Sequence, residues 1–515
     1  MSRASDGVLK FGKWLPDLPT LDNPGLVEAF NVLPVDGTYK PFRYLATQLG
    51  ALATRPYGAV SVLDSSGNAF LYAGTATDLF QRSVATWVDR STAVAYTLSS
   101  IDYWRFAQFD EFVIGTSYSD LPQKLVIGAA ADFEDLADTG TAPRARAIGV
   151  IGRFVVLGNT NEAVNGVQPT RLQWCAIDDC TDWPIPNTAD ALTKQAGEQF
   201  QRASCGPVMA IEGEQQFGII FQRTGIARAT YIGGDRVFQF DYIDQSRGLY
   251  GPNAVATVGM RRYFVSTEGF YVTDGVNVEP IGNNQVDRFF LDDFDATYPE
   301  RIYAAADKER KLIYFAYPGA GNTGGQPNHF LMYNYIEQRW TRADEDVVLI
   351  IDGLSIATSI DDFDDLFDSI DDISPPLDSS FWSGGAPTIL GFSDAAGDTS
   401  LLGTFSADPG ATDFARIETA EVELNPGLYT YISGVKPLVT GTDEDSIISV
   451  RLKVRNLMTE AQAEAPGSFQ SATPTATTGY CDFDSESIYN SVVVQIVGLF
   501  DRAIGIHYQQ QASGT

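Results

Sequence analysis

Side chains suited to catalysis at neutral pH are scarce in this sequence. The chain has two histidines, His329 and His507, which lie far apart in loop or terminal contexts. Imidazole is the commonest general base near pH 7. With two histidines, the chain has few residues from which to build a histidine-based triad or a histidine-rich metal site. We expect both histidines to be surface or packing residues.

The four cysteines do not indicate a metal site or a disulfide framework. Cys175 and Cys180 are close in sequence, while Cys205 and Cys481 are remote. This spacing matches neither paired Cys-x-x-Cys zinc ligands nor a dense set of disulfides. We therefore expect buried thiols, and we predict neither a metal nor a cofactor.

A run of aspartates is the most concentrated set of possible metal ligands. Its members are Asp361, Asp362, Asp364, Asp365, Asp368, Asp371 and Asp372. Closely spaced carboxylates can bind calcium, but the glycine and the closing glutamate of an EF-hand loop are missing. Apolar residues at Ile360, Phe363, Leu366, Phe367 and Ile370 instead predict a short amphipathic helix with an acidic face. That face would meet solvent or a neighbouring subunit.

Carboxylates elsewhere in the chain do not form a recognisable hydrolase motif. Glycosidases need two acids beside the scissile bond. Asp235, Glu268 and Asp274 all stand in turn contexts, and Gly233-Gly234 indicates a hairpin turn rather than a phosphate-binding loop. We predict that the protein is not an enzyme, and a carbohydrate-binding or glycan-hydrolysing β-propeller is the alternative.

The elements that carry these residues follow a repeat of strand, polar turn and strand. The first strands of six copies begin at Val60, Trp104, Ala147, Val208, Ala254 and Ile302. Repeats of roughly 45 residues with several short strands each are typical of propeller blades, which bury their two apolar faces by stacking around an axis. We predict an all-β fold, a β-propeller of about six or more blades with an added C-terminal β region. A β-sandwich or an array of unrelated β domains is the alternative.

The breaks in this repeat divide the chain into four parts. Residues 1–55 are predicted to be an extended N-terminal docking segment, and residues 56–346 are the propeller blades. Residues 347–385 are an acidic insertion. Residues 386–515 form a C-terminal β region, either a sandwich or further blades that close the ring. No apolar run reaches the ~18 residues of a membrane span or the pattern of a signal peptide, so we expect a protein made in the cytoplasm without a membrane span.

The charge balance excludes several partners. Lys and Arg number 35 and Asp and Glu number 66, which gives a net charge of −31. Proteins that bind nucleic acid or anionic membranes use basic surfaces, so neither is expected as a specific ligand. Hydrophobic residues make up 44% of the chain, enough for a large core, so the acid lies on the surface of a folded body.

Several segments resemble a known family. The opening motifs are Phe11-Gly-Lys-Trp-Leu-Pro-Asp17, Asn23-Pro-Gly25, Asn31-Val-Leu-Pro34 and Gly37-Thr-Tyr-Lys-Pro-Phe42, and later ones are Tyr333-Asn-Tyr-Ile-Glu-Gln-Arg-Trp340 and Leu377-Asp-Ser-Ser-Phe-Trp-Ser-Gly-Gly385. These segments are similar to those of the tail nozzle or tail hub proteins of short-tailed bacteriophages. This family is also described as tail tubular protein B-like.

The resemblance implies a structural virion protein. Its protomers would form a homo-oligomeric ring, usually a hexamer, below the portal and head-to-tail adaptor proteins, with tail fibres or spikes attached nearby. The ring would be the conduit for DNA ejection, assembled in the host cytoplasm. An acidic channel repels the DNA backbone, so the genome would pass through without specific binding. A secreted adhesin is a third possibility, against which the missing signal sequence argues.

Candidate contact residues follow from this interpretation. Aromatic and apolar residues in polar loops outside the blades are predicted to form the subunit interface: Trp14, Pro16, Phe363, Phe367 and Trp382. The aspartates from 361 to 372 are predicted to face the channel or rim.

Overall fold

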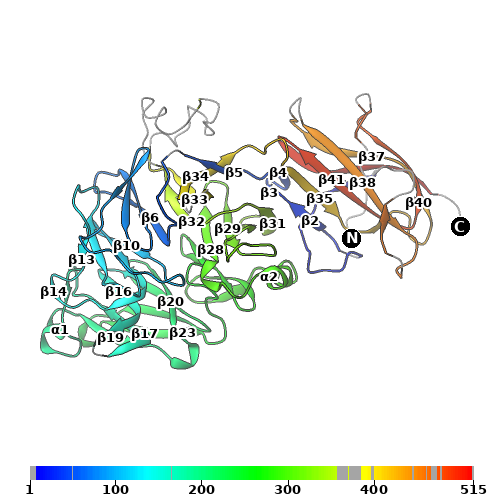
Figure 1. Cartoon of the computed structure of the whole chain (residues 1–515). Helices are drawn as coiled ribbons and strands as arrows, with labels where there is room; N and C mark the ends of the chain where they lie inside the picture. Colours follow the sequence, from blue (N-terminus) through cyan, green and yellow to red (C-terminus); the bar gives the residue numbers. More distant parts are fainter. Residues whose placement is uncertain are drawn as a thin grey trace.

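The computed structural model describes residues 7–21, 23–48, 50–163, 165–355, 369, 384–395, 399–442, 446–459, 461–464, 473–475 and 478–512. Their regular secondary structure is almost entirely β-strand, arranged as a propeller joined to a β-sandwich (Figure 1). The all-β propeller predicted from the repeat, with an added C-terminal β region, is confirmed.

The described part of the propeller has seven four-stranded blades. The first strands are β6 (Gly58–Leu63), β10 (Arg105–Phe109), β15 (Arg144–Ile151), β20 (Val208–Gly213), β24 (Val255–Val258), β28 (Tyr303–Asp307) and β32 (Leu349–Leu354). The second strands are β7 (Ala69–Gly74), β11 (Phe112–Thr116), β16 (Phe154–Glu162), β21 (Phe217–Gln222), β25 (Arg261–Ser266), β29 (Leu312–Tyr317) and β33 (Pro387–Ala395). The third strands are β8 (Leu79–Ser83), β12 (Gln123–Val126), β17 (Gly166–Trp174), β22 (Ile226–Tyr231), β26 (Gly269–Thr273), β30 (His329–Asn334) and β34 (Thr399–Ala407). The fourth strands are β9 (Thr86–Asp89), β13 (Glu134–Asp135), β19 (Gly197–Phe200), β23 (Phe238–Asp244), β27 (Val278–Pro280), β31 (Arg339–Asp344) and β5 (Tyr44–Thr47).

The first strands meet around the propeller axis, where strands of adjacent blades contact one another. Hydrogen bonds from side chains connect the first strands of neighbouring blades. Thr257 donates a hydrogen bond to Glu212, and Asp352 accepts one from the backbone N–H of Ala306 at 2.6 Å. Polar side chains near the axis therefore satisfy groups of neighbouring blades.

An N-terminal strand closes the propeller ring. In blade seven, β32, β33 and β34 come from the later part of the chain, while β5 supplies the fourth strand by antiparallel pairing with β34. Because β5 leads directly to blade one, one stretch of chain fastens the last blade to the first.

The second part of the molecule is a sandwich of two sheets. One sheet has the order β3 (Val32–Val35), β4 (Thr38–Pro41), β42 (Arg502–Ala512), β37 (Thr430–Thr440) and β40 (Cys481–Ser487), with β1 (Val8–Lys10) also paired to β42. The other contains β2 (Leu26–Phe30), β35 (Phe414–Thr419), β36 (Val422–Glu423), β41 (Tyr489–Val497), β38 (Ile447–Arg455) and β39 (Ala463–Glu464). The N-terminal strands and the C-terminal strands thus build the sandwich jointly.

Short elements connect the blades. They are β14 (Thr139–Gly140), β18 (Asp182–Trp183), α1 (Ala189–Thr193), α2 (Asp287–Asp293), η1 (Ala203–Cys205), η2 (Gly234–Arg236) and η3 (Pro299–Arg301). No helix among the described residues is long and apolar enough to cross a membrane.

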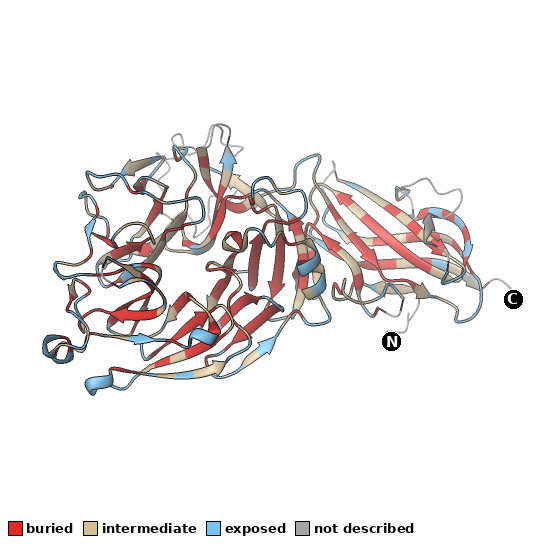
Figure 2. Ribbon diagram, turned by 60° about the horizontal axis from the view of Figure 1, so that its bottom comes forward, coloured by how far each residue is buried: buried red, intermediate tan, exposed pale blue. Residues whose placement is uncertain are grey.

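A single sheet of ten strands joins the propeller to the sandwich. Blade six ends in β31, which pairs in parallel with β2, and β2 in turn pairs with β35. One buried hydrophobic cluster follows the same path and includes Trp340 of blade six, Leu26 of β2 and Val494 of the sandwich. Figure 2 shows the buried residues concentrated along the strands of both parts. The contact between the propeller and the sandwich, which we call the joint, therefore consists of one continuous sheet and one continuous hydrophobic core.

The observed boundaries differ from the predicted ones. The seventh blade begins at Leu349 and resumes at Pro387, so the propeller continues past residue 346. Its first strand lies within the region 347–385 that was predicted as an insertion, and its second strand follows that region. The segment 1–55 is not simply extended, because β1 to β4 complete the sandwich and β5 completes blade seven. The sequence pattern is local and carries no sign of these distant pairings.

The contact between blades three and four gives a first prediction. A Cβ atom at Gly213, at the end of β20, would overlap the backbone oxygen of Val150 in β15. We expect Gly213→Ala to lower the free energy of unfolding by about 2 kcal/mol, because the two inner strands must separate. Gly434→Ala is the control, since its Cβ would lie 3.2 Å from the flexible Gln509 side chain and 3.3 Å from the backbone oxygen of Cys481, without overlap. Urea denaturation followed by tryptophan fluorescence measures both, and equal midpoints would contradict the prediction.

Candidate functional site

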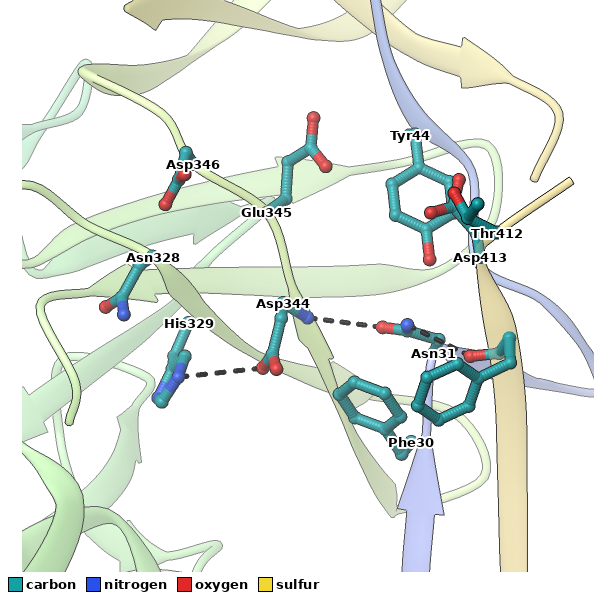
Figure 3. A pocket seen from close by; sticks show the side chains of 11 residues that line it. Phe30, Asn31, Tyr44, Asn328, His329, Asp344, Glu345, Asp346, Thr412 and Asp413 are labelled. Atoms are coloured by element: carbon teal, nitrogen blue, oxygen red, sulfur yellow. Dashed lines mark hydrogen bonds and ion pairs between the residues drawn. The ribbon is translucent and has the colours of Figure 1, made fainter. Parts of the chain in front are cut away.

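A polar pocket lies where the propeller meets the sandwich. Its volume is about 570 Å³. The lining residues, most of them labelled in Figure 3, are Phe30, Asn31, Tyr44, Asn328, His329, Asp344, Glu345, Asp346, Thr412, Asp413 and Phe414. They come from the ends of β2, β31 and the starts of β5, β30 and β35, which the ten-stranded sheet and the ring closure bring together. We call this hollow the joint pocket.

Asn31 follows β2 and connects the two strands on either side of it, β31 and β35, by hydrogen bonds. Its side-chain N–H donates to the backbone oxygen of Phe414 at 3.1 Å, and its side-chain oxygen accepts from the backbone N–H of Asp344 at 3.2 Å (Figure 3). Its own backbone N–H donates to the oxygen of Arg342 at 2.8 Å. The residue has a left-handed conformation with φ of 52°, which asparagine tolerates better than most residues. This turn between β2 and β3 directs the chain from one sheet to the other.

His329 lies between two carboxylates at one side of the pocket. Its Nδ1 is 2.7 Å from Oδ2 of Asp293, and its Nε2 is 3.7 Å from Oδ1 of Asp344. Burial disfavours the charged imidazole, but the hydrogen bond and charge of Asp293, together with the charge of Asp344, outweigh it and raise the pKa of His329. The imidazolium form is therefore favoured by this setting.

Among the carboxyl groups of the joint pocket, Glu345 has the pKa that differs most from its ordinary value. Burial raises its pKa to about 7, and the nearby charges of Asp346 and Asp413 act in the same direction. The N–H of Leu45 in β5 donates to its Oε1 at 3.4 Å, which opposes the rise. Burial likewise raises the pKa of Asp344. A partly protonated acid beside ionised ones can donate a proton, and the set together can accept a cationic group.

The sequence-predicted contact residues are found in different places. Trp14 is 1% exposed, and its indole packs edge-on against Phe289 and donates to the oxygen of Val27. This side chain is therefore used within the chain and is not on its surface, while Pro16 is half-buried. Phe363, Phe367, Trp382 and the seven aspartates from 361 to 372 lie outside the described residues.

The other sequence candidates have structural roles. Asp274 accepts hydrogen bonds from the backbone N–H groups of Val276 and Asn277, as expected in a turn, and these bonds lower its pKa. Asp235 and Glu268 are exposed. The joint pocket brings none of these three acids together. His507 contacts the hydroxyl of Tyr480 in the sandwich, at 2.6 Å.

The cysteines and the metal-ligand candidates show no binding centre in the part that the structure describes. All four cysteines are buried, as expected. Burial raises the pKa of the Cys180 thiol and of the Cys481 thiol to about 12. Within the described ranges, no group of three or more His, Cys, Asp or Glu side chains could hold a metal ion.

Sequence reasoning did not find the joint pocket. Its acids, Asp344-Glu345-Asp346, lie at the predicted end of the propeller. Acidic residues at the end of a repeat resemble an ordinary solvated turn. Only the pairing of β2 with β31 and β35 sets Asn31 and Asp413 opposite them.

Comparison with known proteins identifies no family for this chain. No family model matches the chain, and no curated protein matches it. Among solved structures, the chain is similar to the WD40 domain of Neurospora crassa Pan2, with 8% identity and a TM-score of 0.38. The match covers 70% of this chain and 95% of that one. The propeller assignment rests on the sheet topology of the chain itself.

The ionisation of Glu345 gives a second prediction. We expect Glu345→Gln to raise the free energy of unfolding by about 1–2 kcal/mol at pH 8 and to have a much smaller effect at pH 5. A folded-state pKa of about 7 means that the native protein binds this proton more tightly than the unfolded chain does. The resulting stabilisation is full below the unfolded pKa and is lost as pH rises through 7. Glutamine keeps the acceptor for Leu45 without needing a proton.

Urea denaturation at the two pH values tests this difference. Asp235→Asn removes an exposed carboxylate that does not line the joint pocket and is the control. A Glu345→Gln variant that gains no stability at pH 8 relative to pH 5 would contradict the assignment.

Proposed function

We propose that this protein is a structural subunit of a bacteriophage tail nozzle or hub, and that it forms a homo-oligomeric ring, usually a hexamer, through which DNA leaves the capsid. The observation that carries the proposal is the ten-stranded sheet that runs from blade six through β2 into the sandwich. A subunit of a load-bearing ring must hold its parts in fixed orientation, and a shared sheet with a shared core does so better than a flexible linker. The motif resemblance in the N-terminal segment supports the same assignment, because these motifs flank β2 and form most of β3 and all of β4 at the joint.

The distribution of acid also supports the proposal. The net charge is −31, and the joint pocket is rich in carboxylates. A second hollow of about 570 Å³ at the hairpins of blades one to three is lined by Asp64, Asp110, Glu111, Asp178 and Asp179 among others. Such surfaces repel a polyanion, so DNA in transit would not adhere. Partners would be the portal and adaptor complex and the fibre or spike proteins, in the virion.

The experiment is to image the purified full-length protein by negative-stain electron microscopy and to measure its mass by analytical ultracentrifugation. A closed ring with a central hole and a mass several times that of the chain is expected. In parallel, double-stranded DNA is titrated at low and moderate salt, and no tight salt-sensitive binding is expected. A particle that stays monomeric at high concentration, or one that binds DNA tightly, would count against the proposal.

A second candidate function is glycan binding or hydrolysis. The observation in its favour is Glu345, whose pKa of about 7 suits a general acid, in a pocket that also holds Asp344 and Asp413. Incubation of the protein with a panel of host-surface glycans tests this function. Glycan turnover that Glu345→Gln abolishes would favour it over the conduit, whereas turnover by neither protein would remove it.

A further inference from the structure

A small cavity lies at the end of the propeller channel where the inner strands begin. It is lined by residues that directly precede or start three of these strands: Arg55, Pro56 and Tyr57 before β6, Asp102 and Tyr103 before β10, and Glu300, Arg301 and Tyr303 at β28. Blades one, two and six therefore contribute to a single site. None of these residues belongs to the joint pocket.

The charges around this cavity do not balance. Asp102 is 8% exposed and is matched by Arg146, whose guanidinium lies 3.3 Å from it, and by hydrogen bonds from Ser99 and Ser119. Burial raises the pKa of the Glu300 carboxyl, and the nearby charge of Arg55 opposes that rise. Asp102 is thus in an ion pair, and Glu300 has a cation near it.

Arg301 is the cation left over. Its side chain is 9% exposed, and its buried Nη1 has no hydrogen-bond partner among the residues that the structure describes. A buried guanidinium N–H without an acceptor is destabilising, so an anion in contact with Nη1 would stabilise the fold. The lining residues carry two positive and two negative charges, and Arg146, which pairs with Asp102 from outside the lining, leaves one positive charge in excess.

Two tyrosines add neutral donors to the same cavity. Tyr103 and Tyr303 are 9% and 7% exposed, and burial raises the pKa of each to about 12, so both remain protonated at working pH. Neither hydroxyl makes a hydrogen bond to any residue that the structure describes. Each O–H can therefore donate to a group bound in the cavity. Tyr103 belongs to the entry of blade two and Tyr303 to blade six.

The size of the cavity limits what can enter. The space open to the centre of a water-sized group is about 10 Å³, which admits one small ion or one water. We propose that the cavity binds a single halide-sized monoanion, chloride in the cell, through Arg301 and the hydroxyls of Tyr103 and Tyr303. The ion links blade two to blade six at the mouth of the channel. The site is independent of the proposed function, because it needs no assembled ring.

The direct test is anomalous diffraction from crystals of the full chain soaked in sodium bromide. A bromide peak within hydrogen-bond range of Arg301 Nη1 is expected, and the peak is expected to vanish in Arg301→Gln. Bromide found only at other positions would show an adventitious ion only. That result, or density for water alone in the cavity, would overturn the proposal.

A solution measurement gives a second readout. The thermal unfolding midpoint is recorded against sodium chloride, with sodium gluconate keeping the ionic strength constant. The wild-type midpoint is expected to rise with chloride as for one site, and the half-maximal concentration is expected to increase about ten-fold or more in Arg301→Gln. Arg153→Gln, which breaks an exposed ion pair with Asp178, is the control and is expected to keep the wild-type response.

A variant of the tyrosines covers the case in which Arg301→Gln does not fold. Tyr103→Phe combined with Tyr303→Phe keeps both rings and removes only the two hydroxyls. A weaker chloride response in this double variant is expected, and an unchanged response together with no bromide peak would reject the site.

Discussion

Replacement of Glu28 by alanine is expected to lower the free energy of unfolding by about 3 kcal/mol. Glu28 lies in β2, at the centre of the joint, and binds two arginines from opposite sides. Its Oε1 is 2.8 Å from the guanidinium of Arg342 in blade six, and its Oε2 is 2.6 Å from that of Arg416 in the sandwich. One carboxylate thus pairs with a cation from each part of the molecule.

The expected loss follows from what the substitution leaves behind. The Glu28 side chain is 15% exposed and the two arginines are 23% and 33% exposed. Both guanidinium groups also lie over the ring of Phe30, at 4.7 Å for Arg342 and 5.8 Å for Arg416. Without the carboxylate, two partly buried cations face each other with no anion between them. Breaking a buried pair costs 3–5 kcal/mol, and partial exposure reduces that range to roughly its lower end.

Urea denaturation of the full chain measures the effect. Asp178→Asn is the control, because it removes a carboxylate from an exposed pair with Arg153 and is expected to change stability by less than about 0.5 kcal/mol. Combining Glu28→Ala with Arg416→Met should cost less than the sum of the two single changes, since one unpaired cation is then gone. Equal midpoints for wild type and Glu28→Ala would show that the pair contributes nothing to the joint.

The local hairpin pattern explains why most of the propeller could be predicted. The predicted first strands began at Val60, Trp104 and Val208, and the structure has them at Gly58, Arg105 and Val208. An antiparallel hairpin places its apolar residues and its turn within one short stretch, so its period is visible without knowledge of the rest of the chain.

Pairings between distant segments could not be predicted in this way. β5 pairs with β34 more than 300 residues away, and β2 inserts between β31 and β35. The short N-terminal strands have no hairpin partner nearby, so their pattern resembled an extended docking segment. Trp14 shows the same effect, because its aromatic neighbour Phe289 belongs to α2 in a distant part of the chain. The joint pocket depends on these pairings and was missed for that reason.

Asn31→Ala is the second substitution with a large expected effect, a loss of about 3 kcal/mol. The residue is 7% exposed, and its amide joins the backbone of Asp344 in blade six to that of Phe414 in the sandwich. Alanine leaves a part-buried N–H and a part-buried C=O without these partners, at roughly 1 kcal/mol each. It must also adopt the left-handed conformation, which costs roughly 1 kcal/mol more for a residue other than glycine or asparagine.

A graded series separates these two contributions. Asn31→Gly tolerates the positive φ and loses only the two hydrogen bonds, so a loss of about 2 kcal/mol is expected. Asp36→Ala is the matched control for the backbone, since Asp36 has the same φ of 52° but is exposed, and about 1 kcal/mol is expected there. Urea midpoints ordered wild type, Asp36→Ala, Asn31→Gly, Asn31→Ala would assign most of the cost to the bridge between the two parts. If Asn31→Gly were as stable as the wild type, the bridge would contribute nothing, and the rigid joint on which the ring proposal rests would depend on the sheet pairing and the Glu28 carboxylate alone.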